Sequence, residues 1–190
     1  MTLYCATTNP GKLREFRLAA LEIVPLPNLA AIEAPDETGQ TFEENAIQKA
    51  LYYSVHAPGP LFADDSGLEV DALGGAPGVL SARFAGPHAT DEENNRLVLE
   101  RLGNSEHRAG RFVCAIAVAE KGRLLHTFRG VVEGLILVAP RGPNGFGYDP
   151  LFYYPPFGWS FGEVSGDRKL TVSHRGRALT AMMEWLSDQR

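Results

Sequence analysis

The fold class is decided by residues 111–134, RFVCAIAVAEKGRLLHTFRGVVEG. Two runs rich in apolar and β-branched residues flank Lys121-Gly122, a pattern that predicts two antiparallel strands joined by a tight turn. Segments with helical patterns lie on both sides of this hairpin in the sequence. Because strands and helices mix in this way, we predict an α/β protein with a mixed sheet.

Helical segments surround the hairpin. The segments 41–56 and 90–102 each open with Thr and carry Glu three residues later, the spacing of a capping box. Residues 173–189 form an amphipathic pattern with Ser173 as the candidate N-cap. All three segments are therefore predicted to be helices.

The N-terminal end carries a strand and a helix. Residues 2–7 read as a short buried strand. After the turn TNPG, residues 12–21 read as a helix with Leu13, Phe16 and Ala20 on one face. This strand–turn–helix order places a polar turn at the end of a buried strand.

Composition limits the possible partners. The chain has 190 residues, 44% hydrophobic and 22% charged, which is ordinary for one globular domain. A net charge of -5 argues against nucleic acids and membrane surfaces as partners, because both need a basic face. We expect no signal peptide or membrane span, since no run approaches about 18 apolar residues. Cys5 and Cys114 lie in apolar runs and are predicted to be buried free thiols in a reducing, cytoplasmic location.

The first polar segment is TTNPGK, residues 7–12, between the predicted strand and helix. The N-terminus of a helix offers free backbone N–H groups and the positive end of its dipole, and Lys12 adds a full charge. These features indicate a phosphate site. The alternative is an Asn-Pro-Gly turn with Lys12 in solvent, and the six residues alone do not separate the two.

The second segment is LFADDSGLEVDALGG, residues 61–75, which places Asp64 next to Asp65. Taken alone, DDSG is typical of a solvated turn. The functional interpretation is a strand end where one carboxylate faces a cleft, because adjacent strand residues point to opposite faces. Mg²⁺ typically binds one or two carboxylates together with substrate phosphates, so a carboxylate here suits a nucleotide hydrolase.

Two further segments contribute aromatic and cationic side chains. In residues 142–158, rich in Gly, Pro and aromatics, Phe146 and Tyr148 are candidates to flank a base. Phe152 and Tyr154 are interpreted as core residues that close this loop. Farther along, DRKLTVSHRGRAL gathers three donors near the start of the last helix, which indicates a site for an anion or a carbonyl oxygen. These donors are Lys169, His174 and Arg175.

The order of TTNPGK, TFEENAIQKA, DDSGLEVDALGGAPGVLSARFAG, GFGYDP and SHRGRAL resembles that of the inosine triphosphate pyrophosphatase family, the XTP/dITP diphosphatases. The resemblance runs from Thr7 to Leu179. It implies hydrolysis of deaminated purine nucleoside triphosphates to the monophosphate and pyrophosphate with Mg²⁺. It also implies one domain over residues 1–190, with an elongated mixed sheet, two lobes around a central cleft, and a homodimer.

The resemblance also implies roles residue by residue. Asp65 matches a metal-binding and water-activating carboxylate, and Lys49 matches a phosphate-contacting lysine. A second metal carboxylate is expected from PDETG, where Glu37 is chosen and Asp36 is the alternative. The expected substrate-binding positions also include Thr7, Thr8, Asn9, Pro10, Gly11 and Lys12 for the triphosphate, Ser66 beside the metal carboxylate, and Phe146, Gly147, Tyr148, Asp149, Lys169, His174 and Arg175 for the nucleoside and its base.

The chain departs from the family pattern at three places without losing a charged group. Thr8 stands where the family usually has Gly, Leu80 where it usually has Tyr, and FGEV replaces an AE-type segment. Two other functions are open: a pyrophosphatase for other nucleotides, and a nucleotide-binding regulator without catalysis. Asp65, Lys12 and Lys49 argue against the regulator, since sensing needs no water-activating carboxylate.

Overall fold

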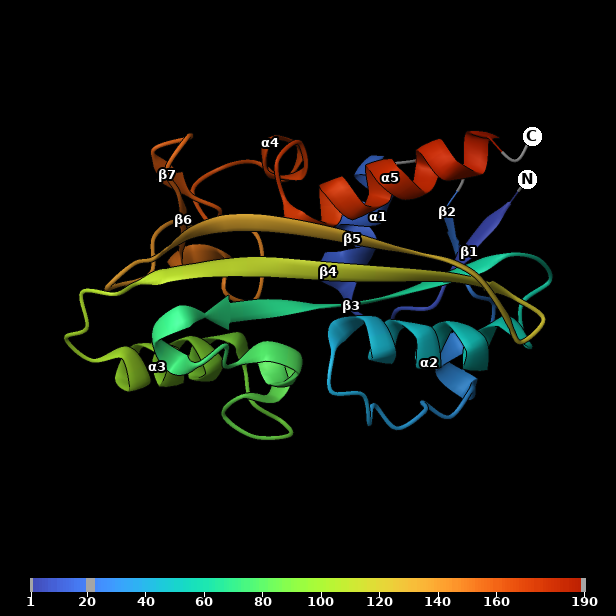
Figure 1. Ribbon diagram of the computed structural model, residues 1–190, viewed down its shortest axis with the longest axis horizontal. Coiled ribbons are helices and arrows are strands. Elements are labelled where there is room, and N and C mark those ends of the chain that lie inside the picture. Colours follow the sequence, from blue (N-terminus) through green and yellow to red (C-terminus); the bar gives the residue numbers. More distant parts are fainter. Residues whose placement is uncertain (1, 20–22, 189–190) are drawn as a thin grey trace.

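The computed structural model describes residues 2–19 and 23–188, and within them the chain forms one seven-stranded sheet (Figure 1). The strand order is β2-β1-β3-β4-β5-β6-β7. β1 is parallel to both of its neighbours, and the other pairs are antiparallel, so the predicted mixed sheet is confirmed. The strands are β1 (Leu3–Cys5), β2 (Ile23–Pro25), β3 (Leu61–Val70), β4 (Ala109–Glu120), β5 (Arg123–Ile136), β6 (Phe152–Tyr154) and β7 (Trp159–Ser160).

The predicted hairpin is the longest part of the sheet. β4 and β5 pair along almost their whole length and turn at Lys121-Gly122, where both residues have positive φ. Glycine adopts such a backbone without strain, whereas for lysine it is uncommon. Because β4 lies between β3 and β5, the hairpin forms the centre of the sheet.

Helices cover both faces of the sheet. Figure 1 shows α1, α4 and α5 on one side and α2 and α3 on the other. One apolar core, with Phe16 and Met182, lies under α1 and α5, and a second, with Ala46 and Ala50, lies under α2. The helices are α1 (Pro10–Ala19), α2 (Phe42–Ser54), α3 (Asp91–Leu102), α4 (Gly166–Leu170) and α5 (His174–Asp188), with short 3-10 segments at Leu29–Ala31, Asp71–Leu73, Gly78–Arg83 and Asp149–Leu151.

The predicted helix starts are confirmed. Thr41 and Thr90 each form both hydrogen bonds of a capping box, with Glu44 and Glu93. Ser173 Oγ accepts from the backbone N–H of Gly176, 3.1 Å away, and so caps α5. At the ends of the predicted patterns, Ala20 and residue 189 lie outside the described residues.

The segment around Asp64 and Asp65 differs from prediction. It is neither a solvated turn nor a strand end, because β3 runs through it from Leu61 to Val70. β1 pairs with β3 only at Leu61 and Phe62 and then leaves the sheet. Among the described residues, the stretch 63–68 therefore has a strand partner on the β4 side alone. The other edge of β3 is open where the two aspartates lie.

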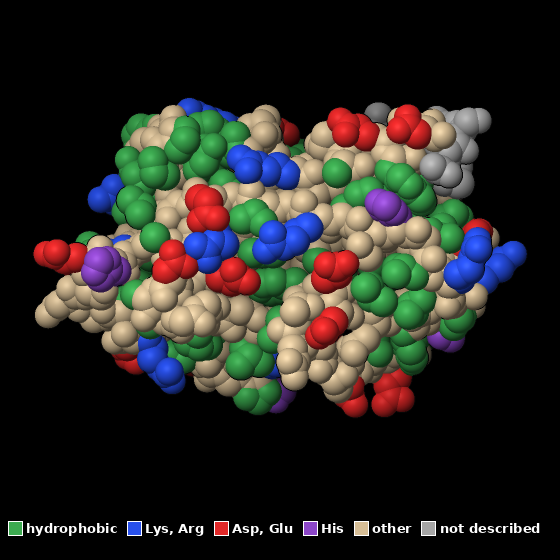
Figure 2. Space-filling model, in the orientation of Figure 1, with side chains coloured by type: hydrophobic (Ala, Val, Ile, Leu, Met, Phe, Trp, Pro, Cys, Tyr) green, Lys and Arg blue, Asp and Glu red, His purple; other side chains and the backbone are tan. Residues whose placement is uncertain are grey.

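The cysteines are buried and unpaired, as predicted. Burial raises the pKa of Cys5 and of Cys114 to about 12, so both thiols stay protonated at neutral pH. In the part of the chain that the structure describes, no helix has the length and apolar character to cross a membrane. Figure 2 shows acidic and basic side chains interspersed on one face and apolar side chains gathered over β6 and β7, where Trp159 is 51% exposed.

Candidate active site

A pocket of about 370 Å³ lies along the open edge of β3. Its wall is built by the loop before α1, by α2, by the segment 146–149, and by the start of α5. Nearly all of the predicted site residues line it: Thr7, Thr8, Asn9, Lys12, Glu37, Lys49, Asp65, Ser66, Phe146, Gly147, Tyr148, Asp149, Lys169, His174 and Arg175. Pro10, Gly11 and the alternative acid Asp36 are not part of the wall.

The loop TTNPGK begins α1, but its first N–H groups already have a partner. Asn9 Oδ1 accepts from the backbone N–H groups of Gly11 (2.8 Å) and Lys12 (3.1 Å). Asparagine is a preferred N-cap because its short side chain reaches these groups. The expected set of free N–H groups is therefore reduced, and the positive charge at this end of the pocket comes mainly from Lys12.

Gly11 has a packing role instead of a place in the wall. A Cβ at this position would lie 2.5 Å from Cδ1 of Phe146. Glycine thus lets the aromatic ring rest on the first turn of α1, which ties residues 142–158 to the loop 7–12.

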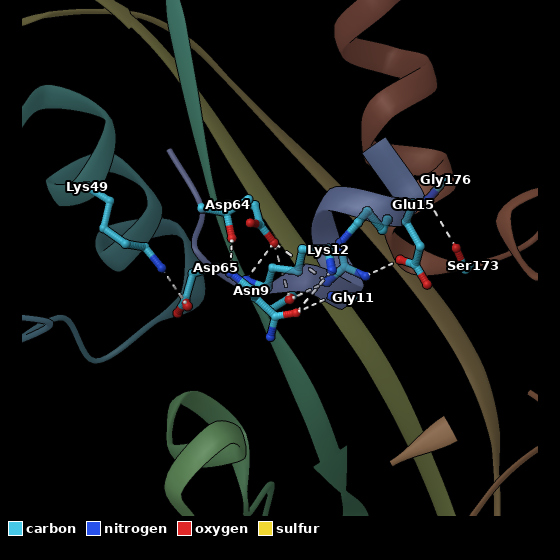
Figure 3. Close-up of polar contacts among 12 residues, drawn as sticks. Asn9, Gly11, Lys12, Glu15, Lys49, Asp64, Asp65, Ser173 and Gly176 are labelled. Carbon is cyan, nitrogen blue, oxygen red and sulfur yellow. Dashed lines mark hydrogen bonds and ion pairs between the residues drawn. The ribbon is translucent and has the colours of Figure 1, made fainter. Parts of the chain in front are cut away.

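The adjacent aspartates face opposite sides of β3, as alternation requires. Asp64 Oδ2 lies 2.9 Å from Lys12 Nζ of α1, whereas Asp65 Oδ1 lies 3.0 Å from Lys49 Nζ of α2 (Figure 3). Both side chains still line one pocket, because the edge of β3 between them has no strand partner. The open edge therefore explains the pairing that the sequence left unresolved.

We call Glu37, Lys49 and Asp65 the Lys49 cluster. Lys49 Nζ lies 3.1 Å from Glu37 Oε1 and 3.0 Å from Asp65 Oδ1, and Asn45 Nδ2 donates to Asp65 Oδ2. Burial raises the pKa of Asp65, and the nearby Lys49 only partly offsets this. Burial also acts upward on Glu37, but Lys49, Lys12 and Arg83 together outweigh it and leave the pKa of Glu37 below its ordinary value. The two acids of one cluster thus have opposite pKa shifts.

The Lys49 cluster fits a magnesium site that the substrate completes. Among the described residues, no group of three or more His, Cys, Asp or Glu side chains is placed to hold a metal ion by itself. Mg²⁺ does not need such a cage, since it usually takes one or two carboxylates together with waters and substrate phosphates. Glu37 and Asp65, which both pair with Lys49, are two carboxylates that would fit such a site.

At the other end lies a buried group that we call the Arg175 cluster: Glu15, Asp149, Lys169 and Arg175. Lys169 Nζ lies 2.6 Å from both Glu15 Oε1 and Asp149 Oδ2, and Arg175 donates to Glu15 Oε2. All four residues are buried, with no more than 6% of their surface exposed. Sequence reasoning missed Glu15, and only its spacing of three residues from Lys12 on α1 hinted at a common face.

Donor capacity remains within this cluster. An ammonium group has three N–H donors, and Lys169 uses two of them on Glu15 and Asp149. Arg175 Nε and His174 Nδ1 are buried and have no hydrogen-bond partner among the residues that the structure describes. Burial, followed by the nearby Arg175, holds the pKa of His174 well below its ordinary value, so the ring is neutral at pH 7. Unused buried donors and acceptors of this kind favour a polar ligand.

The segment 146–149 is fixed to α3 and to the 3-10 segment Gly78–Arg83. Gly147 donates its N–H to Asp91 Oδ2 (2.6 Å) and accepts at its carbonyl from Asn95 Nδ2 (2.9 Å). Tyr148 is buried, and its hydroxyl donates to the Ser81 carbonyl, so its ring is a packed part of the wall. Phe146 is half-buried and lies against Lys169, with Nζ 4.9 Å from the ring centre. The predicted core role of Phe152 is confirmed.

The comparisons with known proteins agree with this geometry. The model of the Ham1 family matches residues 3–185. The dITP/XTP pyrophosphatase of Acidobacterium capsulatum is 51% identical over 196 aligned positions, which cover 96% of this chain and 97% of that protein. Two solved structures are similar with a TM-score of 0.89: the Ham1 protein of Staphylococcus aureus (36% identity, all of both chains) and a HAM1 protein of Coxiella burnetii (39% identity, 99% of this chain and 100% of that one). The chain belongs to the Ham1 family.

Proposed function

We propose that this protein hydrolyses the non-canonical purine nucleoside triphosphates ITP, dITP and XTP to the monophosphate and pyrophosphate. The observation that carries the proposal is a single pocket with the Lys49 cluster at one end and the Arg175 cluster at the other. A cluster of lysines and carboxylates suits a triphosphate with its metal, and buried donors suit a base with a carbonyl oxygen. The relatives named dITP/XTP pyrophosphatase support the same assignment.

The triphosphate is proposed to lie between Lys12 and Lys49, with the hydroxyls of Thr7 and Thr8 beside it. Pre-positioned positive charge of this kind stabilises the charge that develops in the transition state, usually the largest catalytic contribution. Glu37 and Asp65 would hold Mg²⁺. When bound, the ion supplies further positive charge to the phosphates.

Asp65 is the proposed general base. Its carboxylate accepts a proton from water as the water oxygen forms a bond to the α-phosphorus, and the bond from that phosphorus to the bridging oxygen of pyrophosphate breaks. A base works best when its pKa approaches the working pH, and in the metal-free protein burial raises the pKa of Asp65. Lys49 and Asn45 hold the two carboxylate oxygens in place.

The Arg175 cluster is proposed to select the base. Hypoxanthine and xanthine carry a carbonyl oxygen at position 6, which accepts from the free donors of Lys169 and Arg175. Adenine carries an amino group there and would leave these donors unpaired, at a cost of about 1–3 kcal/mol each. Sites built around a polar contact discriminate by up to about 10⁴-fold, so ATP should be a very poor substrate.

Product analysis with labelled water tests the reaction. In H₂¹⁸O with Mg²⁺, ITP should yield IMP and pyrophosphate, with the label in IMP because water attacks the α-phosphorus. Phosphorus NMR and mass spectrometry identify both products, and removal of Mg²⁺ with EDTA should stop the reaction. Release of IDP and orthophosphate would refute the assigned bond cleavage, and binding without turnover would favour the regulator.

Other features of the proposal concern the whole molecule. We propose that the chain is one domain whose two lobes flank the pocket, and that it acts as a cytoplasmic homodimer. Large exposed apolar side chains, among them Leu80 at 47% and Val138 at 76%, give a second copy surface to cover. Sedimentation equilibrium distinguishes a dimer from a monomer of 20.7 kDa.

A further inference from the structure

Asp64 has no part in the chemistry described so far, yet it lies between the two ends of the pocket. The residue is 3% exposed, and a single oxygen, Oδ2, faces all of its charged partners. Lys12 Nζ lies 2.9 Å from that oxygen, and Arg175 Nη2 lies 3.6 Å from it. One carboxylate oxygen thus lies between a lysine of the triphosphate site and an arginine of the base site.

Ser66 completes this connection. Its hydroxyl accepts from Arg175 Nη2 at 2.7 Å and donates to Asp64 Oδ2 at 3.3 Å. Arg175 is therefore held on one side by Glu15 and on the other by Ser66 and Asp64. Asp64 and Ser66 belong to β3, whose backbone is paired with β4 at both residues, so their positions are fixed relative to the sheet.

The charges that surround residue 64 explain why an ionised side chain is needed there. The ion pairs around Asp64 join Glu15, Asp64 and Asp149 to Lys12, Lys169 and Arg175, three negative charges against three positive charges. Lys12 Nζ and Arg175 Nη2 both face Oδ2 of Asp64, so this carboxylate supplies the negative charge between the two cations. A neutral group here would leave an excess positive charge between the two sites.

We propose that Asp64 is a positioning residue that couples triphosphate binding to base selection, an inference that rests on the proposed function. A triphosphate draws Lys12 away from Asp64, whose oxygen then pairs with Arg175 and Ser66 alone. The guanidinium is held more firmly, so the donors that read the base are fixed when the phosphates are in place. Loss of the charge at residue 64 loosens Arg175 and frees Lys12 at the same time.

The test compares the same substitution at adjacent residues. For wild type, Asp64→Asn and Asp65→Asn, calorimetry measures the Kd of the α,β-methylene analogues of ITP and ATP and of tripolyphosphate, which has no base. In Asp64→Asn we expect the preference for the ITP analogue over the ATP analogue to fall at least tenfold, and the Kd of tripolyphosphate to decrease at least threefold. In Asp65→Asn the preference should stay within threefold of wild type.

Ser66→Ala provides a second variant that keeps every charge. It removes the hydroxyl between Asp64 and Arg175, so the preference for the ITP analogue should fall. The Kd of tripolyphosphate should not decrease as it does in Asp64→Asn, because Lys12 keeps Asp64 as its partner. This variant answers the question if Asp64→Asn does not fold, as judged by circular dichroism. An unchanged preference in the folded Asp64→Asn protein, or in Ser66→Ala, would overturn the coupling.

The outcome is independent of turnover. The analogues cannot be cleaved at the α–β position, so the three Kd values do not depend on the proposed reaction. A wild-type protein that prefers the ITP analogue but releases no pyrophosphate from ITP would contradict the proposed function and leave the coupling standing. A variant that hydrolyses ITP with unchanged preference would contradict the coupling alone.

Discussion

The ring of Phe146 rests on Gly11 so closely that any Cβ at residue 11 would contact it. The contact joins two segments that lie 135 positions apart in the sequence, the loop that begins α1 and the loop 142–158. Both segments line the pocket, so the packing of one glycine bears on the shape of the site.

Gly11→Ala should therefore destabilise the protein although alanine is the better helix former. Overpacking costs about 1–3 kcal/mol, whereas the helix preference for alanine over glycine is about 1 kcal/mol. We expect a lower Tm and a higher KM for ITP, because Phe146 must move. Gly59→Ala is the control, since a Cβ there meets nothing closer than 3.7 Å. A Tm at or above the wild-type value in Gly11→Ala would contradict the packing argument.

Asp65→Asn should abolish most of the activity without unfolding the protein. The amide keeps the shape of the carboxylate but accepts no proton, and loss of a general base typically costs about 10²–10⁴-fold in rate. Steady-state kinetics with ITP should show the loss in kcat, and the Tm should change little because the charge of Asp65 is disfavoured by burial. Near wild-type kcat would remove Asp65 from the chemistry.

Glu15→Gln should be strongly destabilising. Glu15 is 6% exposed and pairs with two buried cations, Lys169 and Arg175. Removal of one member of a buried ion pair typically costs about 3–5 kcal/mol. Glu100→Gln is the matched control, because Glu100 makes an exposed pair with Arg96 at 4.0 Å and should change stability by less than about 0.5 kcal/mol. Urea denaturation measures both, and equal effects would argue against the importance of burial.

Arg175→Lys should narrow the ratio of kcat/KM for ITP to that for ATP, chiefly by lowering activity on ITP. Lysine keeps the charge but lacks the planar guanidinium, which donates hydrogen bonds to Glu15 and Ser66 at the same time. For the wild-type protein we expect kcat/KM to be well above the GTP value for both ITP and XTP. The kcat/KM for GTP should be above or equal to that for ATP, because guanine shares the carbonyl oxygen at position 6. Steady-state kinetics of the wild-type protein and Arg175→Lys on ITP, XTP, GTP and ATP test both expectations. An unchanged ratio would exclude Arg175 from base selection.

His174 should make stability fall in mild acid. Burial lowers the pKa of His174 in the folded protein, so below its unfolded pKa of about 6.5 the unfolded chain binds a proton that the folded chain does not. The free energy of unfolding should then decrease by up to about 1.4 kcal/mol per pH unit as pH falls from 6.5. His174→Phe, which can still stack on Phe112, should lack this part of the slope. Urea denaturation measures the free energy of unfolding of both proteins between pH 5 and pH 7. If that free energy changes with pH equally in the two proteins, His174 is not the group responsible.

The sequence by itself determined the class of the fold and most of the residues of the candidate site. Hairpin and helix patterns depend on local geometry: the turn at Lys121-Gly122, the capping boxes at Thr41 and Thr90, and the N-cap at Ser173 are all confirmed. Such signals are readable because their partners lie within a few positions of one another.

Only the tertiary structure decided how the charges are paired. Asp64 and Asp65 looked like a turn because local propensity carries no information about β1, which ends after Cys5 and leaves the edge of β3 open. Glu15 looked like an ordinary helix residue, although its partners Lys169 and Arg175 follow more than 150 positions later. Folding removes water from both partners of a buried ion pair, and their mutual attraction offsets that cost only when the tertiary structure brings them together. No local pattern encodes which distant segments meet.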